Sequence, residues 1–136
     1  MKAIAYMIIL GGMLLMVSPL VSATCVQGDA AGTWHAYSNS VDFSDGYYWL
    51  RCKLAVNSTG VMNTTSSWCK DPYGNTYYAQ GGSSFLVSST CKVSGNINAN
   101  GVNNKIVLAW LNRSKNVISG VGTWTNGWFS FTAIKQ

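Results

Sequence analysis

Apolar and polar side chains alternate along much of the chain, and the stretch YYWLRCKLAVN at residues 47–57 shows this most clearly. Its even-numbered positions from Tyr48 to Val56 are apolar, whereas Arg51, Lys53 and Asn57 fall on the opposite face. Successive side chains of a β-strand point to opposite sides, so this pattern predicts a half-buried antiparallel strand. After the apolar N-terminal stretch, no window shows the three- and four-residue spacing of an amphipathic helix.

Turn-forming sequences recur at short intervals along the rest of the chain, among them KDPYGN at 70–75, NANGVNN at 98–104 and the pair Asn126-Gly127. Asn-Gly is a strong hairpin signal because both residues tolerate positive φ. The segments between the turns predict strands at 33–39, 47–57, 61–68, 75–79, 84–88, 91–98, 105–111, 117–124 and 128–134.

Connections this short favour consecutive hairpins. The predicted fold is therefore all-β: an antiparallel up-and-down meander that closes into a barrel of about eight strands and so removes exposed strand edges. A two-sheet sandwich is the alternative, but its Greek-key topology requires longer connections. In the last hairpin, Phe129 and Phe131 share the face expected to fill the barrel, and Trp124 and Trp128 flank the turn at one rim.

The first 23 residues have the composition of a secretory signal peptide. Lys2 is followed by an uncharged apolar stretch that ends at Val21-Ser22-Ala23, with small residues at the positions that signal peptidase recognises. Cys25 lies close to this point, as in a lipoprotein, but Thr24 and Ser22 do not fit a lipobox. We expect residues 24–136 to form a single exported domain, secreted or periplasmic, whose membrane contact is limited to the export signal.

The four cysteines are expected to form two disulfides, because exported proteins fold in an oxidising compartment. Three pairings are possible. The hairpin centred near residue 59 places Cys52 almost opposite Cys69, which favours that pair and leaves Cys25 with Cys91. A metal site is not expected, because the cysteines lack CxxC spacing and His35 is the only histidine. The sequons at Asn57, Asn63 and Asn112 carry sugar only if the host glycosylates its exports.

Nine Lys and Arg against four Asp give a formal net charge of +5. The basic residues are scattered singly and form no stripe, which argues against a nucleic-acid partner. Catalysis is not expected either, since His35 and the loop residues Asp29, Asp42, Asp45 and Asp71 form no recognisable nucleophile–base set or carboxylate pair. Aspartates in loops are more often turn formers.

Gly32-Thr33-Trp34, at the start of the first predicted strand, resembles the G-x-W signature of lipocalins and the GTW that begins the avidin barrel. The resemblance implies a calycin-like barrel in which Trp34 packs across the closed end. A second lipocalin motif is missing, and Arg113 is poorly placed for the arginine that stacks on that tryptophan. The stretch VLAWLNRS followed by GVGTW is similar to strands of the avidin pocket, although its biotin-binding polar residues have no match here.

The chain is also similar to small secreted bacterial proteins of unknown function that end in SGVG…FxFTA, here residues 119–122 and 129–133. That likeness implies nothing about activity.

The chain has six Trp and seven Tyr, of which Tyr6 falls in the expected signal peptide. These aromatic side chains can fill the barrel, or they can form a platform on which rings or sugars stack. The sequence therefore predicts a binding protein without a cofactor, holding a small hydrophobic or carbohydrate ligand. The alternative is a surface-associated interaction or inhibitor protein with a filled barrel. The candidate ligand residues are Trp49, Trp68, Tyr73, Tyr77, Tyr78, Trp124 and Trp128.

Overall fold

The computed structural model describes residues 24–136, and the expected signal peptide at 1–23 lies outside this range. The described chain holds one 3-10 helix and nine strands. Their bounds are η1 Gln27–Ala30, β1 Gly32–Asp42, β2 Gly46–Val56, β3 Trp68–Lys70, β4 Thr76–Tyr78, β5 Ser84–Val87, β6 Lys92–Ala99, β7 Val102–Leu111, β8 Val117–Trp124 and β9 Gly127–Lys135.

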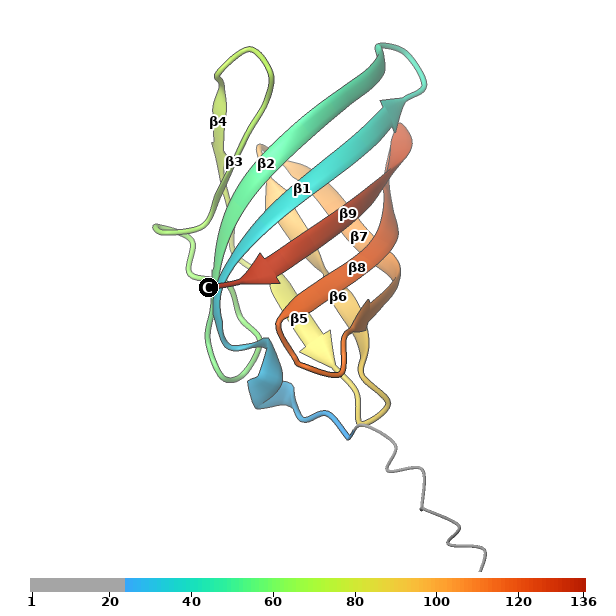
Figure 1. The fold of residues 1–136 in the computed structure, drawn as a ribbon. Helices are drawn as coiled ribbons and strands as arrows, with labels where there is room; N and C mark the ends of the chain where they lie inside the picture. Colours follow the sequence, from blue (N-terminus) through green and yellow to red (C-terminus); the bar gives the residue numbers. More distant parts are fainter. Residues whose placement is uncertain (1–23) are drawn as a thin grey trace, which may run out of the picture.

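The strands form one antiparallel sheet in the order β4-β3-β2-β1-β9-β8-β7-β6-β5. The first strand therefore pairs with the last, and the sheet curls round on itself (Figure 1). Isolated bridges join Val61 to Ser84 and Ala79 to Ala99, so hydrogen bonds also span the seam where β4 and β5 would otherwise be free edges. This confirms the predicted up-and-down barrel, with nine strands in place of about eight.

The predicted strand at 61–68 is largely wrong. Only Val61 and Met62 make isolated bridges, and regular pairing resumes at Trp68. The Asn63 side-chain oxygen accepts hydrogen bonds from the backbone N–H groups of Thr65 and Ser66, which folds the chain into a turn. An asparagine that bonds the backbone two residues ahead competes with strand pairing.

The Asn-Gly pair predicted to turn the last hairpin is displaced by one residue. Trp124 pairs with Gly127, so Thr125 and Asn126 form the turn and Gly127 already belongs to β9. A Cβ at Gly127 would overlap the Val41 carbonyl, so glycine is needed there for close packing. The pair that does use positive φ is Asn100 (50°) and Gly101 (75°), between β6 and β7.

The end of the barrel near η1 is closed (lower part of Figure 1). Trp34, Leu54, Phe85, Val93 and Ile118 are fully or almost fully buried and form the centre of the hydrophobic core. The Trp34 indole donates a 2.8 Å hydrogen bond to the Ala30 carbonyl of η1. The cation above its ring is Lys135, whose Nζ lies 4.9 Å from the ring centre, and not Arg113.

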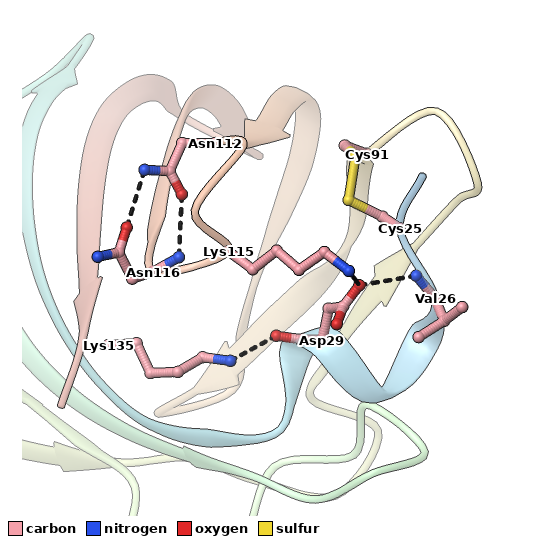
Figure 2. A network of polar contacts seen from close by, with 8 residues as sticks. All are labelled: Cys25, Val26, Asp29, Cys91, Asn112, Lys115, Asn116 and Lys135. Atoms are coloured by element: carbon pink, nitrogen blue, oxygen red, sulfur yellow. Dashed lines mark hydrogen bonds and ion pairs between the residues drawn. A yellow bond between two sulfur atoms is a disulfide. The ribbon is translucent and has the colours of Figure 1, made fainter. Parts of the chain in front are cut away.

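Polar contacts and a disulfide hold the N-terminal segment across this closed end (Figure 2). The Lys115 ammonium lies 2.8 Å from the Asp29 carboxylate, and Lys135 donates a 2.6 Å hydrogen bond to the Asp29 carbonyl. Cys25 is bonded to Cys91. The second disulfide joins Cys52 and Cys69, which lie directly opposite each other on β2 and β3. Both expected disulfides are therefore present.

Candidate functional site

The end of the barrel opposite η1 opens into a cavity of about 500 Å³. Four turns surround its mouth: those joining β1 to β2, β3 to β4, β6 to β7 and β8 to β9 (upper part of Figure 1). Each turn contributes residues to the cavity wall, Asp45, Asp71, Asn100 and Asn126 among them. A hollow of this size falls in the range typical of sites for small organic molecules.

The cavity exists because the inward-facing side chains of β1 become smaller toward the mouth. Trp34 fills the closed end, and the next inward positions are Ala36, Ser38 and Ser40. Ser40 is only 2% exposed, and its hydroxyl lies 3.3 Å from that of Ser38. Three small residues in succession leave space above Trp34 that larger side chains would have filled.

Aromatic rings form one continuous wall of the cavity. The centre of the Trp124 ring lies 6.1 Å from that of Phe129 with an interplanar angle of 26°, and Phe131 follows at 5.9 Å. Tyr48 lies 6.0 Å from Trp124 on the other side. These spacings are typical of favourable aromatic pairs, so the wall is ordered by its own contacts. Burial raises the pKa of the Tyr48 hydroxyl, which keeps this side chain neutral.

Three carboxylates lie at the mouth of the cavity, on two neighbouring hairpins. Asp42 and Asp45 border the β1–β2 turn, and Asp71 begins the β3–β4 turn. Hydrogen bonds from the Ser44 hydroxyl and backbone N–H lower the pKa of Asp42. Desolvation raises the pKa of Asp71, but hydrogen bonds from Asn75 and Tyr77 outweigh it and lower the value overall. Asp42 and Asp71 are therefore charged at neutral pH.

Tyr77 connects one of these carboxylates to the cavity wall. Its hydroxyl donates a 2.9 Å hydrogen bond to Asp71 Oδ2, and this bond is the main reason why the pKa of Tyr77 is raised. Asp71 also accepts hydrogen bonds from the backbone N–H groups of Tyr73 and Asn75. The β3–β4 turn is thus fixed around the carboxylate, which holds its charge at the mouth.

Two of the candidate ligand residues, Tyr77 and Trp124, line the cavity, and Tyr73 lies at its rim. Trp49, Tyr78 and Trp128 lie outside it and are 47%, 56% and 47% exposed. The alternation of side chains explains this, because Tyr48 and Leu50 point inward and Trp49 must then point outward. Trp68 lines a small outer groove with His35 and Arg51, so no ligand can contact all the candidates at once.

Several residues of the cavity are not among the candidates predicted from the sequence. Ser38 and Ser40 were visible as small residues on the same face as Trp34, a signal that the barrel is not filled at that level. The aspartates were interpreted as turn formers, and the structure adds that three of them also line the mouth. Further cavity residues outside the candidates include Tyr48, Leu50, Ile97, Asn104, Phe129 and Phe131.

Within residues 24–136, no group of three or more His, Cys, Asp or Glu side chains is placed to hold a metal ion. His35 lines the small groove that Trp68 and Arg51 also border, and it is not among the residues that line the cavity. Among the described residues, no helix has the length and apolar composition that are needed to span a membrane.

The sequence matches no protein-family model and no curated protein. Two solved structures are similar in fold. A de novo designed fluorescence-activating β-barrel aligns over 82% of this chain and all of its own, with a TM-score of 0.58 at 16% identity. A redesigned β-barrel aligns over 88% of this chain and 99% of its own, with a TM-score of 0.55 at 12% identity. At these identities the likeness shows that the chain folds as a β-barrel.

Proposed function

We propose that this protein is an exported, non-enzymatic binding protein that holds a small organic molecule inside the open end of its barrel. The observation that carries the proposal is the cavity of about 500 Å³ with a continuous aromatic wall. An interior filled by side chains would have favoured the alternative of an interaction protein that binds through its outer face. The similarity to a barrel described as fluorescence-activating is consistent with this choice.

The two disulfides support an exported protein, because such bonds form and persist in oxidising compartments. They also make the site rigid. Cys52–Cys69 lies at the wall of the cavity, and Cys25–Cys91 fixes the closed end. A protein with a preformed cavity loses little conformational entropy when a ligand enters, so little of the binding free energy is spent on ordering the protein.

Binding without catalysis is supported by the polar groups that face the ligand space. They are hydroxyls and amides such as Ser38, Ser40 and Asn104, together with the carboxylates of the mouth. Hydroxyls and amides of this kind orient a ligand, and His35 is not among the residues that line the cavity.

A neutral dye, N-phenyl-1-naphthylamine, tests the proposal. We expect saturable binding of one dye per chain with enhanced fluorescence. The variant Ser38→Leu places a larger side chain in the cavity and should weaken binding by roughly tenfold or more, because the added volume displaces the dye. Ser119→Leu makes the same change at an exposed position of β8 and is the matched control.

The indole N–H signals of the tryptophans locate the dye. Binding in the cavity shifts the NMR signal of Trp124 and leaves that of Trp110, which is exposed on β7, unchanged. Saturable binding that is lost in Ser38→Leu but kept in Ser119→Leu supports the proposal. Absence of binding, or equal loss in both variants when both remain folded, contradicts it.

A second candidate function rests on the outer face of β2, β1 and β9. Val41 lies directly opposite Tyr47 on β2 and Trp128 on β9, and Tyr47, which is 88% exposed, also borders the mouth of the cavity. Trp49 lies on the same face, so this row could form a surface that binds glycans or a protein. In the same NMR experiment with a panel of oligosaccharides, shifts confined to Trp49 and Trp128 would favour the outer face.

A further inference from the structure

Acidic residues are rare in this protein and are concentrated at the mouth of the cavity. The chain has four Asp and no Glu, and three of the four, Asp42, Asp45 and Asp71, line the cavity. The fourth, Asp29, lies at the opposite end, where Lys115 neutralises it. The negative charge at the mouth is therefore a local feature of a protein whose formal net charge is +5.

No Lys or Arg among residues 24–136 lines the cavity. Lys70 follows Cys69 in β3, but its ammonium lies over the Trp68 ring, which borders the outer groove. Lys115 and Lys135 lie at the closed end (Figure 2). Among residues 24–136, Asp42, Asp45 and Asp71 form no ion pair with Lys or Arg, so the mouth carries a local negative charge, which attracts cations and repels anions.

The deeper part of the cavity favours an apolar or aromatic body. Trp124 and Phe129 present their rings, and Leu50 and Ile97 add aliphatic surface. Aromatic faces attract organic cations as well as apolar groups. A metal ion fits less well, because Asp71 already accepts hydrogen bonds at both of its oxygens and no metal-binding cluster is present among residues 24–136.

We propose that the ligand of this cavity is an organic cation: an aromatic or apolar body that packs against Trp124 and Phe129, carrying an ammonium group that remains at the mouth between Asp42, Asp45 and Asp71. This inference rests on the proposed function and specifies its ligand class. The arrangement leaves the ammonium partly hydrated, so its attraction to the carboxylates is not cancelled by desolvation. Fatty acids and other anionic ligands are selected against.

Three probes with the same ring system and different charge test the inference: 1-naphthylmethylammonium, 1-naphthalenemethanol and 1-naphthoate. Dissociation constants are measured by ligand-detected NMR titration at pH 7 and low ionic strength. We expect the cation to bind about tenfold more tightly than the alcohol, and the carboxylate to bind most weakly. Raising NaCl to about 0.5 M should bring the three constants closer together, because mouth charges are exposed to solvent.

Charge-removing variants identify the groups responsible. Asp42→Asn keeps a side-chain oxygen for the hydrogen bonds from Ser44, and Asp45 can be changed to Asn in the same chain. The double variant should reduce the preference for the cation over the alcohol by about threefold or more, because the charge that attracts the ammonium is removed. Asp29→Asn removes one carboxylate at the closed end and is the matched control, with folding checked by thermal unfolding.

The outcomes separate this inference from the proposed function. If all three probes bind with equal affinity and shift the Trp124 signal, the cavity binds ligands but the inferred preference for cations is wrong. If the preference is present but unchanged in Asp42→Asn/Asp45→Asn and in Asp71→Asn, the mouth carboxylates are not its source and the inference is overturned. If no probe binds at the cavity, both proposals fail.

Discussion

The Phe129 ring lies directly over Gly122, its partner on the neighbouring strand β8. A Cβ at position 122 would overlap the Phe129 ring and the Lys105 carbonyl, so any larger residue forces the ring or the backbone to move. The position of the aromatic wall therefore depends on the absence of a side chain next to it. Cross-strand contact of this kind couples a glycine to the shape of the cavity.

This relationship predicts the effect of Gly122→Ala. The added methyl should destabilise the protein by about 1–3 kcal/mol, because overpacking of a well-packed interior is costly. It should also weaken dye binding, since the Phe129 ring must move toward the cavity. Gly81→Ala is the control, because a Cβ there meets nothing within 4 Å. Urea unfolding and dye titration of both variants measure the two effects, and equal behaviour of the two variants contradicts the prediction.

A second prediction concerns Lys135 at the closed end. Its ammonium contacts both the Trp34 ring and the Asp29 carbonyl, so Lys135→Met should cost about 1–2 kcal/mol of unfolding free energy. Methionine keeps the apolar part of the side chain, and the loss therefore reports on the charge. Lys92→Met, at an exposed position of β6, should change the stability little.

The disulfides should differ in their contributions to stability. Cys25–Cys91 spans 66 residues and Cys52–Cys69 spans 17. If the bonds act mainly by restricting the unfolded chain, the longer loop contributes about 4 kcal/mol and the shorter about 3 kcal/mol. Urea unfolding of Cys25→Ala/Cys91→Ala and Cys52→Ala/Cys69→Ala measures this. A larger loss for the shorter loop would show that packing at the cavity wall outweighs chain entropy.

Stability should decrease in acid partly because of Asp29. Hydrogen bonding to Lys115 and to the Val26 N–H lowers the pKa of Asp29 below its ordinary value of 3.8. A carboxylate with a lowered pKa in the folded state stabilises the protein above the unfolded-state pKa, and this contribution is lost as the pH falls through the folded-state value. Urea unfolding from pH 6 to pH 2 should therefore show a steep loss below about pH 4.

Asp29→Asn and Lys115→Met both remove this linkage, so each should make the pH dependence below about pH 4 less steep than in the unmodified protein. If both variants lose unfolding free energy below about pH 4 as steeply as the unmodified protein, the ion pair does not contribute to the acid sensitivity. Because the Asp29 side chain retains 17% exposure, salt should weaken the effect only in part.

Most of the strands could be predicted from sequence because alternation is a local property. The inward face of β2 follows from residues 47–57 alone, and the exposure of Trp49 follows with it. Turns were less predictable, since Asn126-Gly127 and Asn100-Gly101 carry the same signal and differ only in their tertiary contacts. At Gly127 the approach of Val41 determined the role of the glycine, and no local rule contains that information.

The cavity could not be derived from the sequence in the same way. Its wall combines Ser38 of β1, Asn104 of β7 and Phe129 of β9, which come together only through the order of strands around the barrel. The aspartates behave as the local rules predict, since Asp42 and Asp71 both accept bonds from their own turns. That two of these turns are neighbours at one mouth is a consequence of topology, and their combined charge is visible only in three dimensions.

The strands of this barrel carry two separate tasks along their length. Residues that pack the closed end, such as Trp34 and Lys135, occupy one half of β1 and β9, while residues that line the cavity, such as Ser38 and Phe129, occupy the other. Substitutions near the four turns can therefore change the cavity lining without altering the residues of the closed end. The open end can thus be altered, by evolution or by design, independently of the packing that stabilises the closed end.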